Sequence, residues 1–268
     1  MLDCGEMRRD ILRMGLGAKN AGAHFGGSFS LVEVVAALYG GAMTFDPSDL
    51  RAETRDRLVF SKGHGVMPVY AAFRQLGLIS LEELSTYKAT GSDITAHPTV
   101  CARLGTEFAS GSLGQGLSQG AGTCLALRRK DNLTSRTFVI LGDGECNEGS
   151  VWEAAESAAH YRLSNLVAIV DKNGLQYDGD TSAVMSMSEM AAKWRAFGWE
   201  CLECDGHDVK ALSDCLSAKT DRPLCVIAKT IKGKGVSFME GVASWHHGVL
   251  TQKLFDQAMA ELSGGVHD

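Results

Sequence analysis

The sequence predicts an α/β fold in which helices cover both faces of a central, mainly parallel sheet, in three αβα layers. Two observations support this prediction. Short apolar runs, rich in Val, Ile and Leu at consecutive positions, recur along the chain and are typical of strands buried on both faces. Longer stretches with helical spacing of apolar residues separate these runs, as the crossovers between parallel strands require.

Five apolar runs are the expected strands, and eight stretches are the expected helices. The strands read RLVFS at 57–61, TFVILG at 137–142, LVAIVD at 166–171, WECLEC at 199–204 and LCVIAKT at 224–230. The helices are expected at 5–19, 30–39, 64–76, 114–130, 148–162, 188–197, 207–219 and 251–262. Ser30 is the expected N-cap of the second helix, because serine hydroxyls accept backbone hydrogen bonds at that position.

Length, charge and hydropathy restrict the class of protein. A chain of 268 residues can form one large α/β domain or two small ones, and we expect a single domain over residues 1–268. The net charge of −6 gives no support for a nucleic-acid partner. The charged N-terminus lacks the apolar core of a signal peptide, and no apolar run approaches the roughly 18 residues of a membrane span. We therefore expect a cytoplasmic protein whose cysteines are free thiols.

Two polar turns follow neighbouring strands of the predicted sheet. Gly142-Asp143-Gly144 ends the run TFVILG, and Asn173 comes just after LVAIVD. A helix between the two strands makes them parallel, so both turns are expected on one rim of the sheet, close enough to share a ligand. A carboxylate, an amide oxygen and backbone carbonyls suit Mg²⁺, with a phosphate completing the ligand set. The alternative is that Asp-Gly and Asn-Gly serve only as turn residues.

Several segments carry a resemblance to a known family. They read SKGHGVMPVYAAF, SGSLGQGLSQGAG, GDGECNEGSVWEAA, AAHYRLSNLVAIVDKNGLQYDG and KTIKGKGVSFME, and WHHG follows the last of them. In this order they resemble transketolase, from about residue 20 to about residue 250. The resemblance implies the thiamine-diphosphate-binding α/β fold and thiamine diphosphate as the cofactor. It also implies transfer of a two-carbon ketol unit from a ketose to an aldose.

The resemblance further implies which residues bind the metal and the diphosphate. Asp143, Asn173 and the carbonyl of Leu175 would hold Mg²⁺, or Ca²⁺ or Mn²⁺ in its place. The residues that would contact the diphosphate are Gly111, Ser112, Leu113, Gly144 and Asn173. Physical chemistry agrees, because SGSLGQG precedes a helix whose free N–H groups and dipole favour anions. A helix start with loosely placed glycines is the alternative for that segment.

Four histidines and one glutamate complete the site that the resemblance implies. His64 and His247 would contact the cofactor, whereas His24, His97 and His247 would face the sugar. Imidazole titrates in the range that proton transfer at a carbonyl or hydroxyl requires. Across an interface, Glu148 would meet the catalytic glutamate of a partner subunit.

Two positions near this set stay open, and three histidines are expected outside it. His246 has no assigned role, since the family motif usually has one histidine before the glycine. Lys232 would either reach the diphosphate or be solvated. The histidines expected to be structural or exposed are His160, His207 and His267.

The chain departs from the full family pattern in its length. The missing parts are the pyrimidine-binding domain, with the glutamate that activates the cofactor, and the C-terminal domain. We therefore expect the diphosphate-binding subunit of a two-component transketolase, active only with a separate subunit carrying those domains, in an α2β2 heterotetramer. The alternatives are half of a deoxyxylulose-phosphate synthase-like or 2-oxo-acid dehydrogenase-like enzyme, and a non-catalytic scaffold. The sugars stay open: sugar phosphates, a sulfo-sugar and a branched pentose phosphate are the candidates.

Overall fold

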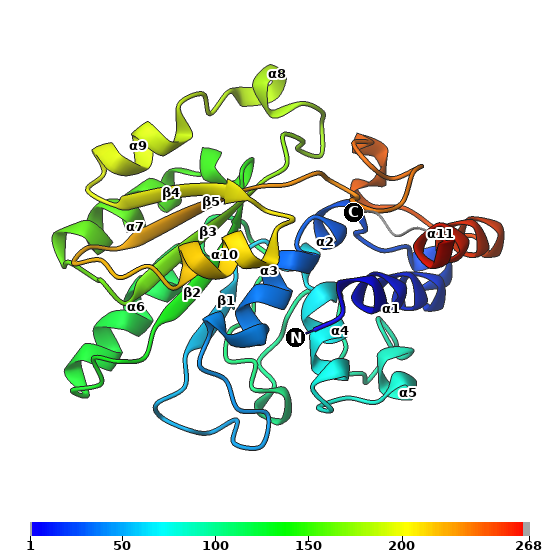
Figure 1. Ribbon diagram of the computed structural model, residues 1–268, viewed down its shortest axis with the longest axis horizontal. Coiled ribbons are helices and arrows are strands. Elements are labelled where there is room, and N and C mark those ends of the chain that lie inside the picture. The colour runs from blue at the N-terminus through cyan, green and yellow to red at the C-terminus, as the bar shows by residue number, and fades with distance from the viewer. Residues whose placement is uncertain (1, 265–268) are drawn as a thin grey trace.

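A computed structural model describes residues 2–264 and contains a five-stranded sheet in which every pair of neighbouring strands is parallel (Figure 1). The strand order is β1-β2-β3-β5-β4. The strands are β1 (Arg57–Phe60), β2 (Thr137–Gly142), β3 (Leu166–Lys172), β4 (Glu200–Asp205) and β5 (Leu224–Lys229). All five expected strands are confirmed, and their bounds differ from the predicted ones by at most a residue at either end.

Each of the eight expected helices is present, although the second is short. They are α1 (Cys4–Gly17), α3 (Val32–Ala37), α4 (Met67–Gln75), α6 (Gly116–Arg129), α7 (Gly149–His160), α9 (Met190–Ala196), α10 (Val209–Leu216) and α11 (Gln252–Gly264). Three helices of four or five residues were not expected: α2 (Gly26–Phe29), α5 (Leu81–Leu84) and α8 (Thr181–Met185). Only α5 has a clear signal in the sequence, because Ser80 and Glu83 form a capping box around its first turn.

The prediction that Ser30 caps a helix at its N-terminus is wrong. Ser30 has helical dihedral angles and ends α2, while α3 begins at Val32 without a side-chain cap. Its buried hydroxyl instead donates to the Asp171 carboxylate at the end of β3, 2.7 Å away. The Ser30 hydroxyl pairs with the buried carboxylate and does not cap a helix, because an unpaired buried charge costs more free energy than a missing cap.

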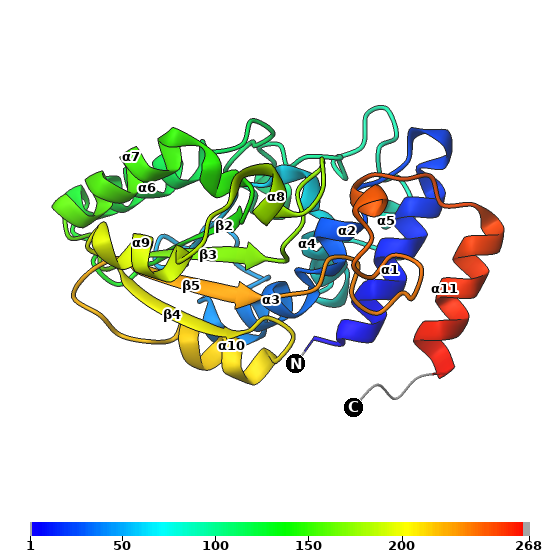
Figure 2. The same ribbon diagram turned by 90° about the horizontal axis from the view of Figure 1, so that it is seen from above.

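Helices cover both faces of the sheet, and alternate strand residues point to each. Phe138, Ile140 and Ile169 face the side covered by α3 and α10, where α1, α4 and α11 extend the same apolar core. Val139 and Ala168 point the other way, toward α6, α7 and α9. Figure 2 shows the two helical layers on opposite sides of the strands. The predicted three-layer αβα architecture is confirmed.

Polar residues follow the carboxyl ends of several strands. β2 and β3 are neighbours, with Gly142 opposite Asp171, so the turns after them share one rim as expected. Lys62 follows β1 and Thr230 follows β5 at the same edge. In Figure 2 the arrowheads of β3 and β5 point toward α2. Within residues 2–264, no helix has the length and apolarity needed to cross a membrane, and all eight thiols are free.

Candidate functional site

A cavity of about 570 Å³ lies at the carboxyl edge of the sheet. Its walls come from the turns after β1, β2 and β3, from α2, and from the loops that carry the histidines. The predicted residues that line it are His24, His64, His97, Gly111, Leu113, Asp143, Gly144, Glu148, Asn173 and Leu175. Ser112 is exposed beside this set without lining the cavity. One cavity therefore brings together most of the residues singled out from segments far apart in the sequence.

Asp143 is a buried carboxylate without a cationic partner in contact among the described residues. Only 5% of its surface is exposed, and it accepts hydrogen bonds from the backbone amides of Gly144 (2.8 Å) and Gly174 (2.7 Å). Burial, and after it the charge of nearby Asp171, raises the pKa of Asp143 to about 6. A bound cation would relieve both causes. These surroundings fit a metal ligand better than a turn residue, which has no reason to be buried.

The other two predicted metal ligands lie in the turn after β3. The side-chain oxygen of Asn173 accepts from the backbone amide of Leu175, and its amide group donates to Asp171. These two bonds fix the orientation of the Asn173 side chain. Residues 2–264 contain no group of three or more His, Cys, Asp and Glu side chains arranged to hold a metal. Besides the Asp143 carboxylate, a cation at this rim would therefore depend on amide and carbonyl oxygens, and on oxygens of a bound phosphate.

Glu145, which the sequence analysis overlooked, ties the glycine loop to the acidic turn. Its carboxylate is buried and accepts from the backbone amides of Gly114 (2.8 Å) and Gly142 (3.0 Å) and from the hydroxyl of Ser61. The loop packs so closely that a Cβ at Gly116 would come within 2.3 Å of Ser61. Close approach thus requires glycine at Gly116, and likewise at Gly114, where a Cβ would come within 2.6 Å of Ser150.

A buried ion pair lies beneath the cavity and was also missed. Asp171 at the end of β3 accepts hydrogen bonds from Lys62, Ser30, Thr230 and Asn173. Burial alone would raise the pKa of Asp171, but Lys62 and the hydroxyl donors outweigh it and lower the pKa. The signal in the sequence was its position: an aspartate in the last residues of a strand buried on both faces needs several donors.

Lys232 is buried and faces the cavity, so the alternative of a solvated lysine is wrong. Its exposed fraction is 2%, and its Nζ lies 3.1 Å from the carbonyl of Leu175 and 3.0 Å from Nδ1 of His246. Burial, and after it the charge of Lys62, lowers the pKa of Lys232 to about 8. Two buried lysine side chains therefore line the cavity, and of these Lys62 is paired with Asp171.

Five histidine rings gather at the same cavity. The ring centroid of His24 lies 4.6 Å from that of His247, 5.3 Å from that of His64 and 5.7 Å from that of His97. His246 lines the cavity 4.9 Å from His64, whereas His247 is exposed next to His24. An antiparallel bridge between Ala23 and Gly248 joins the two histidine segments. This bridge places His24 beside His247, over two hundred positions apart in the chain.

One ring nitrogen of His24 lacks a hydrogen-bond partner within the described residues. Its Nδ1 is buried and has no partner within residues 2–264. Burial, and after it the neighbouring histidines, lowers the pKa of His24 to about 3. Burial, and after it the charges of Lys232 and Lys62, lowers the pKa of His246 to about 4. Burial likewise lowers the pKa of His64, His97 and His247. The histidines of the cavity are therefore neutral near pH 7, able to accept or donate a proton at a polar ligand.

The depressed pKa of His24 predicts a pH-dependent stability. Below the ordinary histidine pKa of 6.5, the unfolded chain binds a proton at this residue that the folded chain does not bind. The free energy of unfolding should therefore fall with decreasing pH from about 6.5 to about 3, by at most about 1.4 kcal/mol per pH unit for this residue. Urea unfolding at pH 7 and pH 5 should show a smaller loss for His24→Asn than for wild type. Equal losses in both proteins would contradict the prediction, and His160→Asn, at an exposed position of α7, is the control.

The remaining predicted positions lie as follows. Glu148 is exposed at the N-cap position of α7, and its carboxylate makes no hydrogen bond to residues 2–264. His160 is exposed at the end of α7, as expected. His207 is partly buried and hydrogen-bonded on both ring nitrogens. His267 lies outside the described residues.

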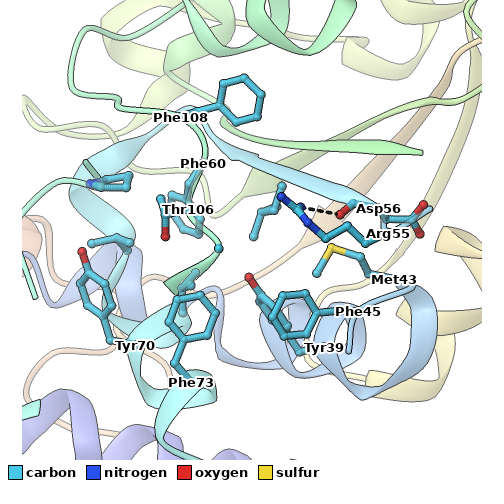
Figure 3. A pocket seen from close by; sticks show the side chains of 15 residues that line it. Tyr39, Met43, Phe45, Arg55, Asp56, Phe60, Tyr70, Phe73, Thr106 and Phe108 are labelled. Carbon is cyan, nitrogen blue, oxygen red and sulfur yellow. Dashed lines mark hydrogen bonds between the residues drawn. The ribbon is translucent and has the colours of Figure 1, made fainter. Parts of the chain in front are cut away.

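A separate, much smaller cavity lies beside β1 (Figure 3). It holds about 30 Å³, roughly the volume of one water molecule. The rings of Tyr39, Phe45 and Phe73 pack against one another along its wall. Arg55 at its edge is already paired with Glu107. This cavity has no room for a sugar or a diphosphate, so the larger one is the candidate site.

Comparison with protein families identifies the group to which this site belongs. The family model described as "Transketolase, thiamine diphosphate binding domain" matches residues 8–263, nearly the whole chain. The chain belongs to the transketolase family. The expected family, the thiamine-diphosphate-binding α/β fold and the transferase class of its members are therefore confirmed.

Two transketolase subunits of similar length are among its relatives. An apulose-4-phosphate transketolase subunit of Phocaeicola vulgatus is 42% identical over 248 residues, which cover 91% of this chain and 88% of that protein. The 6-deoxy-6-sulfo-D-fructose transketolase subunit SqwG of Clostridium sp. is 40% identical over 257 residues, which cover 94% and 90% of the two chains.

A solved transketolase shows the same fold as part of a longer chain. The crystal structure of the Pichia stipitis transketolase in complex with sedoheptulose-7-phosphate matches with a TM-score of 0.88 and 28% identity. The match covers 97% of this chain and 40% of the Pichia stipitis chain. The present transketolase sequence thus spans less than half the length of that relative.

Proposed function

We propose that this chain is the diphosphate- and metal-binding subunit of a two-component transketolase. The observation that supports this best is the opposition of charges in one cavity. Asp143 supplies a buried carboxylate that no cation contacts within residues 2–264, and Lys62 and Lys232 supply buried ammonium groups that line the same cavity. A metal–diphosphate pair matches this pattern, because the cation would face the carboxylate and the phosphates would face the lysines.

The residues around the cavity fit thiamine diphosphate and a divalent metal. Asp143, Asn173 and the Leu175 carbonyl would bind Mg²⁺, with Ca²⁺ or Mn²⁺ as substitutes. The backbone at Gly144 and at Gly111 to Leu113 would contact the diphosphate, together with Asn173. When bound, thiamine diphosphate supplies the nucleophilic carbon that lets a two-carbon ketol unit leave a ketose and join an aldose. The protein supplies orientation, charge and exclusion of water.

The histidines would form hydrogen bonds with the polar atoms of the sugar. His24, His97 and His247 would face the substrate, and His64 and His247 would contact the cofactor. The unpaired Nδ1 of His24 supports a role in hydrogen bonding to a substrate hydroxyl or carbonyl. His246 extends the predicted set, since it lines the cavity between Lys232 and His64. Neutral imidazoles can move protons at hydroxyl groups without adding charge to the cavity.

The site would be completed by another polypeptide. In this proposal residues 1–268 form one diphosphate-binding domain, and a separate subunit carries the pyrimidine-binding and C-terminal domains with the activating glutamate. Glu148, exposed beside the cavity, would meet that glutamate in an α2β2 heterotetramer. Four exposed apolar residues line the same cavity, and such a group supports a surface that the partner subunit covers. We call them the apolar rim: Leu113, Tyr177, Val184 and Met185. The names of the two similar relatives describe subunits and point the same way.

The substrates would be ketoses and aldoses with an anionic group. The two similar relatives are named for apulose-4-phosphate and for a sulfo-fructose, a branched sugar phosphate and a sulfonated sugar. Phosphate and sulfonate are both compact anions, so the same transfer chemistry serves either. We expect a cytoplasmic enzyme of sugar metabolism.

Two histidine variants test the proposed function and its division of roles. His97→Ala should lower turnover with a ketose donor by about 100-fold while cofactor affinity in the assembled enzyme stays within a few-fold, as for a group that acts on the substrate alone. His64→Ala, deeper in the cavity, should weaken thiamine diphosphate binding itself. Calorimetric titration of the cofactor and single-turnover transfer assays separate the two effects.

The exposed His160 offers a matched control, because it is remote from the cavity. His160→Ala should change neither affinity nor turnover. The reverse pattern, with His97→Ala weakening the cofactor and His64→Ala affecting only turnover, would show that the roles of the two loops are exchanged. Normal turnover and normal affinity in both variants would refute the site.

A further inference from the structure

The segment that brings Lys232 to the cavity is held by a cluster of three side chains, two of them buried and one partly buried. Arg8 of α1 forms a bidentate ion pair with Glu33 of α3, with N–O distances of 2.7 and 3.0 Å. His207, in the turn between β4 and α10, lies 2.9 Å from the same carboxylate through Nδ1. α3 packs against both α1 and α10, as Figure 1 shows, so these residues meet across three elements. We call them the Arg8–Glu33–His207 triad.

The hydrogen bonds of His207 select one tautomer. The backbone amide of Ile231 donates to Nε2 at 2.8 Å. Because a backbone amide nitrogen can only donate, Nε2 must carry the lone pair, and the proton must lie on Nδ1. Nδ1 then donates to Glu33, which Arg8 holds in place. Both ring nitrogens are satisfied, and the ring holds the residue next to Lys232.

The same triad also contacts the segment on the far side of Lys232. The Nε of Arg8 donates to the carbonyl of Lys234 at 3.0 Å. Gly235 has a φ of 94°, and a Cβ there would come within 2.9 Å of Arg8 Nε, so only glycine fits this approach. The backbone before Lys232 and the backbone after it are thus both held by the Arg8–Glu33–His207 triad.

Lys232 depends on this support to direct its long side chain. A lysine has many rotamers, and fixing its ammonium group in one place costs conformational entropy unless the backbone and the stem are held. The stem packs against Gly26, where a Cβ would come within 2.7 Å of Lys232 Cγ. Resting on the function proposed above, we infer that His207 is a positioning residue that holds the backbone of Lys232 so that its ammonium group meets the diphosphate.

A pair of substitutions at His207 separates positioning from general stability. The side chain of His207→Asn keeps a donor where Nδ1 lies, toward Glu33, but loses the acceptor for Ile231. The side chain of His207→Gln reaches the position of Nε2 and keeps that acceptor, but loses the bond to Glu33. Each variant gives up one hydrogen bond, so their thermal midpoints should fall by similar amounts. Their affinities for thiamine diphosphate should differ.

Calorimetric titration of the full chain with thiamine diphosphate and Mg²⁺ gives the decisive comparison. His207→Asn should bind about 10-fold more weakly than wild type, and His207→Gln should stay within about 3-fold. In a Lys232→Ala background, His207→Asn should cause no further loss of affinity, because it acts through Lys232. If His207→Asn does not fold, His207→Ala takes its place in the same cycle. His160→Ala is the control.

Two outcomes would overturn the inference while leaving the proposed function intact. In one, the asparagine and glutamine variants bind equally well although Lys232→Ala binds weakly. In the other, the losses from His207→Asn and Lys232→Ala multiply in the double variant. If Lys232→Ala and Asp143→Ala both bind like wild type, or if wild type assembled with its partner subunit shows no Mg²⁺-dependent binding, the proposed function itself fails, and the inference fails with it.

Discussion

Replacing Asp143 with alanine is expected to abolish Mg²⁺-dependent binding of thiamine diphosphate by this chain. The affinity should fall by more than about 100-fold, since even the outer partners of metal ligands are worth 10–100-fold. The Asp143 carboxylate accepts from the Gly174 amide in the Asn173 turn, and its pKa of about 6 reflects the cost of holding that charge without a cation. Calorimetry at fixed Mg²⁺ measures the affinity directly.

The chain should stay folded in this variant. Asp143 accepts only two backbone amides, and its removal also removes an unfavourable buried charge. Asp46→Ala is a matched control, because Asp46 is another turn aspartate that accepts a backbone amide, but it lies in the loop before β1. The control should bind normally. Unchanged affinity in Asp143→Ala, with a normal circular dichroism spectrum, would remove this residue from the proposed metal site.

The second large effect concerns the chain by itself, which should show no ketol transfer. This chain would form only one side of the proposed cofactor site, and the activating glutamate would come from the partner subunit. Proton transfer by a positioned side chain contributes about 10²–10⁴-fold to turnover, so its absence should leave activity at least about 100-fold lower. An open cavity also leaves the reacting atoms in water, which weakens every electrostatic interaction in the site.

The assay compares purified chain, thiamine diphosphate, Mg²⁺ and a ketose–aldose pair with and without the partner subunit. Transfer should appear only in the complete mixture. The apolar rim, whose members Tyr177 and Met185 are 70% and 61% exposed, should also make the isolated chain associate with itself. Light scattering detects that association, and addition of the partner should suppress it. Rapid transfer by this chain alone would refute the two-component proposal.

The sequence alone does not decide whether His246 or His247 faces the cavity. Both precede Gly248 in the same short segment, and nothing in the order of residues says which ring turns into the cavity. In the structure, His246 lines the cavity near Lys232 and His64, while His247 is exposed beside His24. The difference depends on a backbone path set by the bridge between Ala23 and Gly248. The predicted roles of His247 stay proposals, and His246 joins them.

The sequence by itself determined the strands, most of the helices and the rim where the site lies. These are local properties: runs of Val, Ile and Leu predict buried parallel strands, and polar turns such as Gly142-Asp143-Gly144 mark their carboxyl ends. The helix between β2 and β3 was enough to predict that Asp143 and Asn173 share an edge. Ser30 was misassigned for the same reason, since a local cap rule does not include Asp171, which lies 141 positions away.

Only the tertiary structure decided which charges and rings share the cavity. Lys62, Asp171 and Lys232 come from three separate segments, and their meeting depends on the strand order β1-β2-β3-β5-β4, which periodicity does not contain. The burial of Lys232, and with it a pKa near 8, likewise follows from the packing of α2 and of the segment 230–235 around its stem. Burial and long-range pairing are properties of the assembled layers, because a side chain loses its water only when distant segments close over it.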